Sequence, residues 1–346
     1  MKLRVVLAAL VVAAVAVPAA HADPAKVGYP NSIASTGDSI TRAFNTCGFP
    51  FIDCTSNSWS TGTSSSVNSV YSRILARNGL IAGRNRNDAR TGARMIDLNG
   101  QVTTAGTQGV ELVTILMGAN DVCTSSEASM TPVATLRAQF RQALETVTKA
   151  LPNARIAVSS IPNIYNLWSI LRPNSTARFI WSLYGICQSM LANANSTAQA
   201  DVDRRARVAQ RNRDDNDAIA AVCAEYVHCR FDAYAAYNLV FTTTDVSTRD
   251  YFHPSVAGQA KAAAITWANS FDYTDQVAPA STALVSGGTM SVTATDNVAV
   301  SGVEYRFPGG SWARYTGPVA LATGQVVDVR AVDVNGNIEA SHTIIG

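Results

Sequence analysis

The stretch VELVTILMGAND, residues 110–121, decides the class of fold. Its first eight residues are nearly all apolar and rich in β-branched side chains, a pattern typical of a strand covered on both faces. The letters RIAVSS at 155–160 repeat this pattern, and residues 31–36 form a shorter strand that leads into Gly37. We therefore expect buried strands here, the longest of them closed by the turn formers GAND.

Helical patterns separate and follow these strands. They cover residues 131–151, with Pro132 in the first turn, residues 202–226, and residues 255–271, where Ser255 is the expected N-cap. Strands that alternate with helices predict an α/β domain with a mainly parallel sheet and crossover helices.

The pattern changes after Asp275. A linker is expected at 278–280, and alternating strands follow at 289–295, 303–307 and 326–332, separated by turns rich in Gly, Asn and Asp. This spacing predicts a small all-β module of the sandwich type. The expected division is thus an α/β domain over 23–275 and a β module over 276–346.

The first 22 residues predict a secretory signal peptide. Lys2 and Arg4 precede an apolar run at 5–17 that is short for a membrane span, and AHA at 20–22 supplies small residues for cleavage. No second long apolar run follows, so we expect a secreted protein without a transmembrane segment. Without Lys2 and Arg4 the 27 basic residues become 25, equal to the 25 acidic ones. With no basic stripe either, nucleic acid is not an expected partner.

Six cysteines remain in the exported chain. An even number in a secreted protein favours three disulfides. Short loops favour Cys47–Cys54 and Cys223–Cys229, which leaves Cys123–Cys187. The alternative is a metal site, but no C-x-x-C or H-E-x-x-H spacing occurs, so no metal ligand is expected.

The sequence DYFHPS at 250–255 holds the histidine with the best chemical context. Asp250 could accept the Nδ1–H of His253, which would fix the tautomer and leave Nε2 free to act as a base. The alternative is a turn histidine that only caps the next helix.

Three further segments offer a nucleophile and oxyanion donors. Ser39, in GDSI at 37–40, stands where a strand gives way to an expected helix, so its own N–H could face an oxyanion. Asn120 follows the best buried strand, at the kind of edge where α/β folds bind ligands. Gly92, in RTGAR, could offer an unobstructed N–H. Helix capping and ordinary turn chemistry are the alternatives for the Ser39 and Asn120 segments.

Taken in this order, the four segments resemble the SGNH or GDSL hydrolase superfamily, and its phospholipase-B-like and secreted-lipase members in particular. The resemblance covers residues 31–271. It implies a three-layer α/β/α sandwich, a catalytic set of Ser39, His253 and Asp250, an oxyanion hole of Ser39, Gly92 and Asn120, and no metal or organic cofactor. The competing α/β-hydrolase scaffold needs a G-x-S-x-G pentapeptide, which the sequence lacks.

The expected substrate is a lipid ester: phospholipid, lysophospholipid or acylglycerol. Residues 161–187 are rich in large apolar side chains, and Trp168, Leu171 and Trp181 are the candidates to line an acyl groove. Simple helix packing explains them equally well. Deacylation of an acetylated polysaccharide is the alternative reaction, and a surface-binding protein with a decayed hydrolase fold is the alternative class.

The β module resembles bacterial Ig-like domains, which gives a polysaccharide or cell-surface component as a possible partner. Tyr305, Trp312 and Tyr315 could stack on sugar rings, although such aromatics more often pack a sandwich core. Side chains of Asp296, Asp333 and Asn335 could bind calcium, but turn chemistry accounts for them as well.

Overall fold

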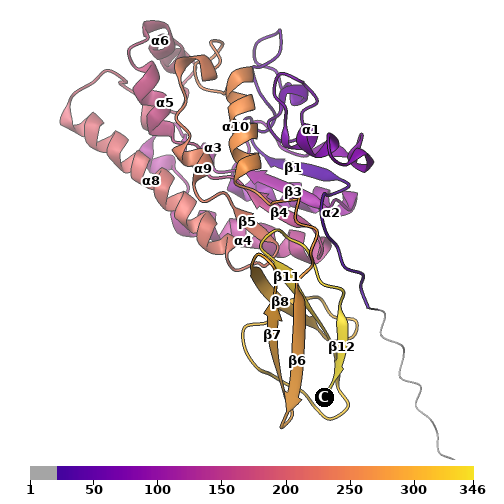
Figure 1. Ribbon diagram of the computed structural model, residues 1–346. Helices are drawn as coiled ribbons and strands as arrows, with labels where there is room; N and C mark the ends of the chain where they lie inside the picture. The colour runs from indigo at the N-terminus through magenta and orange to yellow at the C-terminus, as the bar shows by residue number, and fades with distance from the viewer. Residues whose placement is uncertain (1–21) are drawn as a thin grey trace, which may run out of the picture.

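The computed structural model describes residues 22–346 (Figure 1). The expected signal peptide lies, except for its last residue, outside the described residues. Within the described range, no helix combines the length and the apolar character that crossing a membrane requires.

A five-stranded parallel sheet forms the centre of the larger part, in the order β2-β1-β3-β4-β5. Its strands are Ile33–Gly37 (β1), Asn85–Asn87 (β2), Leu112–Leu116 (β3), Arg155–Val158 (β4) and Cys229–Phe231 (β5). Every residue of β1, β3 and β4 is buried, as expected for strands covered on both faces. Gly37 pairs with Leu116, so the chain leaves β1 and β3 at neighbouring points of one edge.

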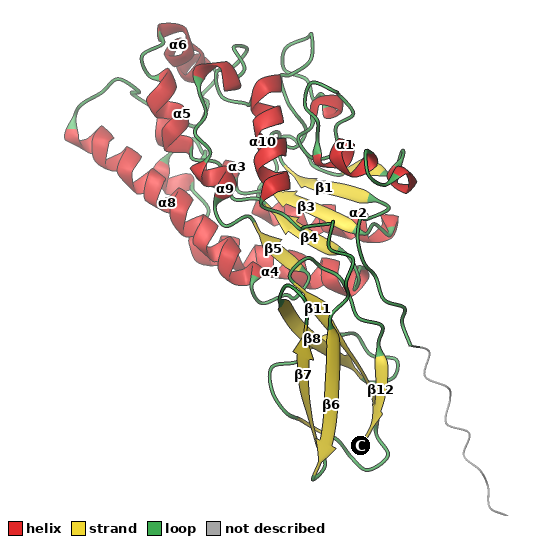
Figure 2. Cartoon of the chain, in the orientation of Figure 1, coloured by secondary structure: helices red, strands yellow, loops and turns green. Residues whose placement is uncertain are grey.

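Helices cover both faces of this sheet, as Figure 2 shows in red around the yellow strands. The α-helices are Val70–Leu75 (α1), Met95–Gln108 (α2), Ala119–Val122 (α3), Val133–Ala150 (α4), Ile164–Leu171 (α5), Ser175–Leu183 (α6), Gln188–Leu191 (α7), Gln199–Cys223 (α8), Ala235–Asn238 (α9) and Val256–Ala268 (α10). The 3₁₀ turns are Thr55–Asn57, Gly79–Ile81, Glu127–Ser129 and Thr243–Asp245.

The alternation of side chains along the strands divides the core into two layers. Val113 and Ile115 pack with α2, α4 and the C-terminal half of α8. Leu112 and Leu116 point the other way and pack with α1 and α10. Because successive strand residues face opposite sides, one sheet serves both helix layers, and the result is the three-layer α/β/α arrangement.

The predicted helices are present with shifted ends. Ser255 is the N-cap of α10 and accepts a hydrogen bond from the Gly258 N–H, as predicted. Pro132 lies one position earlier than predicted, at the N-cap of α4. The edge strands β2 and β5 have three residues each and were not predicted, because NRN and CRF carry no apolar run.

Two antiparallel sheets make up the C-terminal part, in the orders β10-β7-β6 and β12-β11-β8-β9. Their strands are Ala280–Ser286 (β6), Thr289–Thr295 (β7), Val300–Arg306 (β8), Ala313–Arg314 (β9), Val319–Ala320 (β10), Val326–Asp333 (β11) and His342–Ile345 (β12). A separate apolar core lies between the sheets, built around Met290, Val327 and Val329. Tyr305 and Tyr315 pack against it, and Trp312 lies under the guanidinium groups of Arg306 and Arg330.

The C-terminal part packs against the amino-terminal edge of the parallel sheet, at the end away from α5 and α6 (Figure 1). Arg155, the first residue of β4, is buried and donates to the carbonyls of Gly28 and Asn335 and to Asn337 Oδ1. Arg330 of β11 donates in return to the Pro152 carbonyl. Two buried guanidinium groups therefore join the two parts, with carbonyl and amide oxygens as partners.

Candidate active site

Ser39 follows β1 at the carboxyl edge of the parallel sheet. The turn before it requires a glycine: Gly37 has φ +142°, and a Cβ there would lie 2.3 Å from the Leu116 carbonyl oxygen of β3. The prediction of a helix directly after Ser39 is wrong. The chain instead makes irregular turns, because Ala43 and Asn45 adopt left-handed conformations with φ +51° and +65°.

Three side chains form one hydrogen-bonded chain. His253 Nε2 lies 2.7 Å from Ser39 Oγ, and His253 Nδ1 lies 2.6 Å from Asp250 Oδ2. A carboxylate accepts, so Nδ1 carries the hydrogen and Nε2 can accept the proton of Ser39. These contacts were predicted from the sequence motifs. The structure brings Ser39 and His253 together although they are 214 positions apart.

Asp250 is held as a carboxylate by its surroundings. Burial, the largest single effect, would raise its pKa, while the hydrogen bond and charge of His253 act in the opposite direction. The N–H groups of Phe252 and His253 also donate to its Oδ1, and the net effect lowers the pKa of Asp250 below its ordinary value. A negative charge therefore faces His253 throughout the neutral range.

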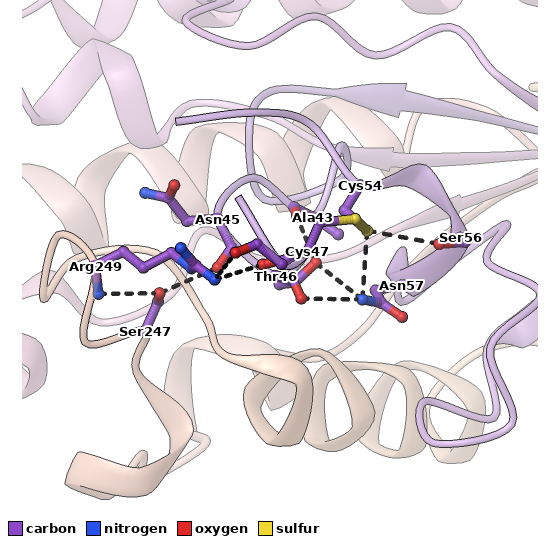
Figure 3. Close-up of a disulfide and its surroundings, with 10 residues drawn as sticks. Ala43, Asn45, Thr46, Cys47, Cys54, Ser56, Asn57, Ser247 and Arg249 are labelled. Carbon is purple, nitrogen blue, oxygen red and sulfur yellow. Dashed lines mark hydrogen bonds between the residues drawn. A yellow bond between two sulfur atoms is a disulfide. The ribbon is translucent and has the colours of Figure 1, made fainter. Parts of the chain in front are cut away.

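Asn45 supports this carboxylate and was not predicted. Its Nδ2 donates to Asp250 Oδ2 at 2.5 Å, and its Oδ1 accepts the Phe51 N–H. Asn45 is 2% exposed, and the neighbouring chain at Ser247 and Arg249 is bonded to the same loop (Figure 3). A single asparagine in an irregular turn carries no sequence signal by which this contact could be found.

The two other oxyanion candidates line the same cavity as Ser39 and His253. Gly92 has φ +80° and open space where a Cβ would lie. Asn120 donates one amide hydrogen to the Ala93 carbonyl at 2.8 Å, and an amide nitrogen has a second hydrogen to offer. The structure thus gathers Ser39, Gly92 and Asn120 around one space, as the sequence motifs require.

Asp121, next to Asn120, fixes the loops on either side of that space. Its Oδ2 accepts the N–H of Met95 at 2.8 Å, and its Oδ1 accepts the hydroxyl of Thr131 at 2.7 Å. Met95 starts α2 directly after the Gly92 loop. The Asp121 carboxyl is therefore a structural link between the two candidate donor segments.

A second buried carboxyl lies beside Ser39. Asp38 Oδ1 accepts the Ile40 N–H at 2.9 Å, while its Oδ2 is buried without a hydrogen-bond partner. Burial raises the pKa of Asp38 to about 7, although the Ile40 N–H and the charge of His253 act in the opposite direction.

The cavity at Ser39 has a volume of about 340 Å³ and a largely apolar wall. Its apolar lining comes from Phe44, Phe51, Tyr184, Ile186 and Phe252, and the Cys123–Cys187 disulfide also borders it. The other two disulfides are Cys47–Cys54 and Cys223–Cys229, so all three pairs match the prediction.

The structure places the three predicted groove residues elsewhere. Trp168, Leu171 and Trp181 are 5%, 2% and 1% exposed and belong to the core beneath α5 and α6. They do not line the cavity at Ser39. Their apolar faces stabilise the helix packing, and Trp181 Nε1 donates to the carbonyl of Tyr251, beside His253. These three side chains therefore agree with the alternative interpretation, in which they only pack between helices.

A group of three carboxylates lies close enough to share a cation among the described residues 22–346. Asp275, Asp296 and Asp333 place oxygens within 4.8 Å of one another at the start of the C-terminal part, away from Ser39. Turn contacts already use part of this set: Asp333 Oδ1 accepts two backbone N–H groups, and Asn335 directs its amide to Asp275.

Several solved structures are similar to the chain at low sequence identity. An extracellular lipase from Streptomyces rimosus is 19% identical, covers 69% of this chain and 99% of its own, and has a TM-score of 0.42. Phospholipase A1 from Streptomyces albidoflavus NA297 is 16% identical, with coverages of 71% and 100% and a TM-score of 0.40. A family 3 carbohydrate esterase from Clostridium thermocellum is 12% identical, with coverages of 69% and 94% and a TM-score of 0.39.

No curated protein is significantly similar to the chain. A family model described as GDSL-like lipase/acylhydrolase matches residues 33–265, from the first residue of β1 into α10. The match covers most of the 346 residues and includes Ser39, Gly92, Asn120, Asp250 and His253. The chain belongs to the GDSL-like lipase/acylhydrolase family and is a carboxylic ester hydrolase of the lipase/esterase type.

Proposed function

We propose that the protein hydrolyses carboxylic esters through an acyl-enzyme on Ser39, and that lipid esters are its substrates. The observation that carries the proposal is the chain of hydrogen bonds from Ser39 Oγ through His253 to Asp250. A serine hydroxyl is a weak nucleophile by itself, and an adjacent oriented base is what activates it.

The reaction follows from these positions. His253 Nε2 takes the proton of Ser39 as Oγ attacks the ester carbonyl, and Asp250 stabilises the imidazolium. The oxyanion of the tetrahedral intermediate accepts hydrogen bonds from the Ser39 and Gly92 N–H groups and from the Asn120 amide. His253 then gives its proton to the leaving alcohol. A water molecule, deprotonated by His253, cleaves the acyl-enzyme and restores Ser39.

The preference for lipid esters rests on the walls of the cavity. Aromatic and aliphatic side chains of Phe44, Phe51, Tyr184, Ile186 and Phe252 surround Ser39, and removing an acyl chain from water against them is favourable. A volume of about 340 Å³ is within the usual range for a small-molecule pocket.

Esters of increasing acyl length test both parts of this proposal. Wild type and Ser39→Ala are compared on acetyl, butyryl, octanoyl and palmitoyl esters of one alcohol. We expect kcat/KM to rise with chain length beyond acetyl, and Ser39→Ala to lose turnover on every ester while it keeps its thermal unfolding transition. Turnover retained by Ser39→Ala would rule out the mechanism. A maximum at acetyl would instead favour removal of acetyl groups from a polysaccharide.

The proposal includes export and a division into two domains. The residue pattern at 1–22 and three disulfides in residues 22–346 support secretion, since disulfides persist in oxidising compartments. A catalytic domain at 23–275 and an Ig-like sandwich at 276–346 agree with the change from a parallel to antiparallel sheets. The aromatic side chains considered for sugar binding are engaged in packing, so no ligand is assigned to the second domain.

A further inference from the structure

Large apolar side chains are exposed in two segments, each of which supplies one residue, Phe51 or Tyr184, to the wall of the Ser39 cavity. We call this set the rim; it comprises Phe49, Phe51 and Ile52 of the Cys47–Cys54 loop and Phe179, Leu183 and Tyr184 at α6. Their exposed fractions are 76%, 49%, 42%, 62%, 58% and 54% in that order. Among residues 22–346, the three most exposed phenylalanines are Phe49, Phe51 and Phe179, and all three belong to the rim.

The rim is continuous with the cavity and across its two halves. Phe51 and Tyr184 both line the cavity, and their ring centroids are 5.5 Å apart. Phe179 and Leu183 are one helical turn apart on α6, and Tyr184 follows Leu183 at the end of this helix. An acyl chain that leaves the cavity therefore passes directly onto apolar surface.

The Cys47–Cys54 loop is held in place with its apolar side chains outward. The disulfide closes the loop, and the Arg249 guanidinium donates to the carbonyls of Cys47 and Gly48 (Figure 3). Asn45 accepts the Phe51 N–H from below. These bonds hold the backbone of the loop in the conformation in which Phe49 is exposed. Apolar groups held in water in this way are a mark of an interaction surface.

The charged side chains of the two rim segments indicate which kind of partner the rim binds. Residues 172–200, which contain α6, include two charged side chains, Arg172 and Arg178. In the loop the one charged side chain is Asp53, which is paired with Arg42 at 2.8 Å. Arg249 donates to the Cys47–Cys54 loop, Arg178 directly precedes Phe179 on α6, and neither segment carries an unpaired carboxylate. Such a combination suits an anionic surface that also accepts apolar side chains.

We propose that the rim docks the protein on a lipid surface with anionic headgroups, with the mouth of the cavity facing the lipid. The inference rests on the proposed lipid-ester hydrolysis and names the physical form of the substrate. A second copy of the chain is a poorer occupant. Two rims face to face would bring like charges together and would close the route to Ser39.

Vesicle binding tests the proposal. All proteins carry Ser39→Ala, so that the lipid is not consumed, and the vesicles are phosphatidylcholine with or without 30% phosphatidylglycerol. The rim variant is Phe49→Ser/Phe179→Ser/Leu183→Ser, which spares the two side chains that line the cavity. We expect it to bind anionic vesicles at least about tenfold more weakly than the parent, since a buried phenylalanine contributes more than a factor of ten.

A control variant removes equally exposed apolar groups elsewhere. Leu80, Leu284 and Val298 are 70%, 68% and 57% exposed and lie outside the rim, and all three are changed to serine. We expect this variant to bind vesicles as the parent does. Binding lost equally in both variants, or in neither, would overturn the proposal, and so would equal affinity for neutral and anionic vesicles.

Two further measurements separate the rim from the chemistry and from self-association. With Ser39 restored, the rim variant should hydrolyse a water-soluble butyryl ester at the wild-type rate. If wild type fails on that ester, the proposed function is wrong, whatever the vesicles show. Light scattering without lipid should find the same mass for wild type and rim variant. A dimer that the rim variant dissociates would assign the rim to a second copy and overturn the proposal.

Discussion

Asn45 joins the Ser39–His253–Asp250 chain to the surface loop that carries Phe51. One amide serves both contacts: its nitrogen donates to Asp250, and its oxygen accepts the Phe51 N–H. At the residue scale, the position of the carboxylate thus depends on a side chain that does not line the cavity at Ser39. Asn45 is a positioning residue under the proposed mechanism.

Replacement of Asn45 tests this role. Asn45→Ala leaves Asp250 Oδ2 with one donor fewer, and a hydrogen bond to a charged group contributes about 1.5–3 kcal/mol. We expect kcat on a soluble ester to fall about 10- to 100-fold with KM unchanged. Asn57→Ala is the control. Asn57 lies beside the Cys47–Cys54 disulfide and donates to Thr46, not to Asp250. An unchanged kcat in Asn45→Ala would contradict the role.

Asp38 gives a pH-dependent effect on stability. In the folded protein its pKa is raised by burial to about 7, against 3.8 for the free side chain. Below about pH 4 the carboxyl is protonated in both the folded and the unfolded state. As pH rises to about 7, only the unfolded state ionises, so Asp38 increasingly disfavours folding.

The variant Asp38→Asn removes this dependence while keeping the acceptor for the Ile40 N–H. Relative to wild type, its free energy of unfolding should rise between pH 4 and 7 by at most about 4 kcal/mol and then level off. Urea denaturation of both proteins across that range measures the difference. A difference that is constant with pH, or that falls, would show that Asp38 is ionised in the folded protein.

At the scale of elements, strands with continuous apolar runs were predictable and edge strands were not. VELVTILM and RIAV contain β3 and β4 because both faces of these strands are covered. The edge strands β2 and β5 have no such pattern, and β6 begins within the expected linker at Ala280. The helix expected after Ser39 is replaced by turns, which a propensity argument cannot detect when the deciding residues are Ala43 and Asn45.

The same limit applies to the substrate groove. Trp168 and Trp181 have the composition of a groove wall, but composition does not tell which face of a helix meets the core. Tertiary packing buries both rings, and the cavity takes its wall from Phe51, Tyr184 and Phe252. By contrast, the motifs around Ser39, Asn120 and His253 predicted that these residues meet. Ser39 and Asn120 follow the ends of β1 and β3, and His253 lies in the turn before α10.

The disulfides should differ in their contribution to stability. Cys123 and Cys187 are 64 positions apart and join the end of α3 to the start of α7, whereas Cys223 and Cys229 are 6 apart. On loop-closure entropy alone, replacing the first pair by alanine should cost about 4 kcal/mol and the second about 2 kcal/mol. Chemical denaturation of the two double variants checks this order, and the reverse order would contradict the argument.

In the whole molecule, the Ser39 site and the β module lie at opposite edges of the parallel sheet. Ser39 follows β1 at the carboxyl edge, and Arg155 begins β4 at the amino edge, where the β module docks. No sequence pattern predicts this contact, because the partners of Arg155 are Gly28, Asn335 and Asn337, which are distant from it in the sequence. The contacts that the β module makes for stability therefore lie at one edge of the sheet, and the chemistry at Ser39 takes place at the other.

The change Arg155→Ala tests this separation. It removes the donor of the buried Gly28 and Asn335 carbonyls and one of the two donors of Asn337 Oδ1, and we expect the free energy of unfolding to fall by about 3–5 kcal/mol. The kcat/KM on a soluble ester should stay within about twofold of wild type at 20 °C, because the cavity is at the other edge. Arg314→Ala, which removes an exposed contact to Ala224 at the same junction, should cost under about 1 kcal/mol. Equal losses in the two variants would contradict a special role of Arg155.

In the proposed mechanism, His253 activates Ser39 as the nucleophile. The most direct measurement treats the protein with a fluorophosphonate and maps the adduct by mass spectrometry of peptides, with His253→Ala as the comparison. We predict one adduct per chain, on Ser39, formed at least about a hundredfold more slowly in His253→Ala. An adduct on another residue, or no reaction of a folded wild-type protein, would show that Ser39 is not the activated nucleophile.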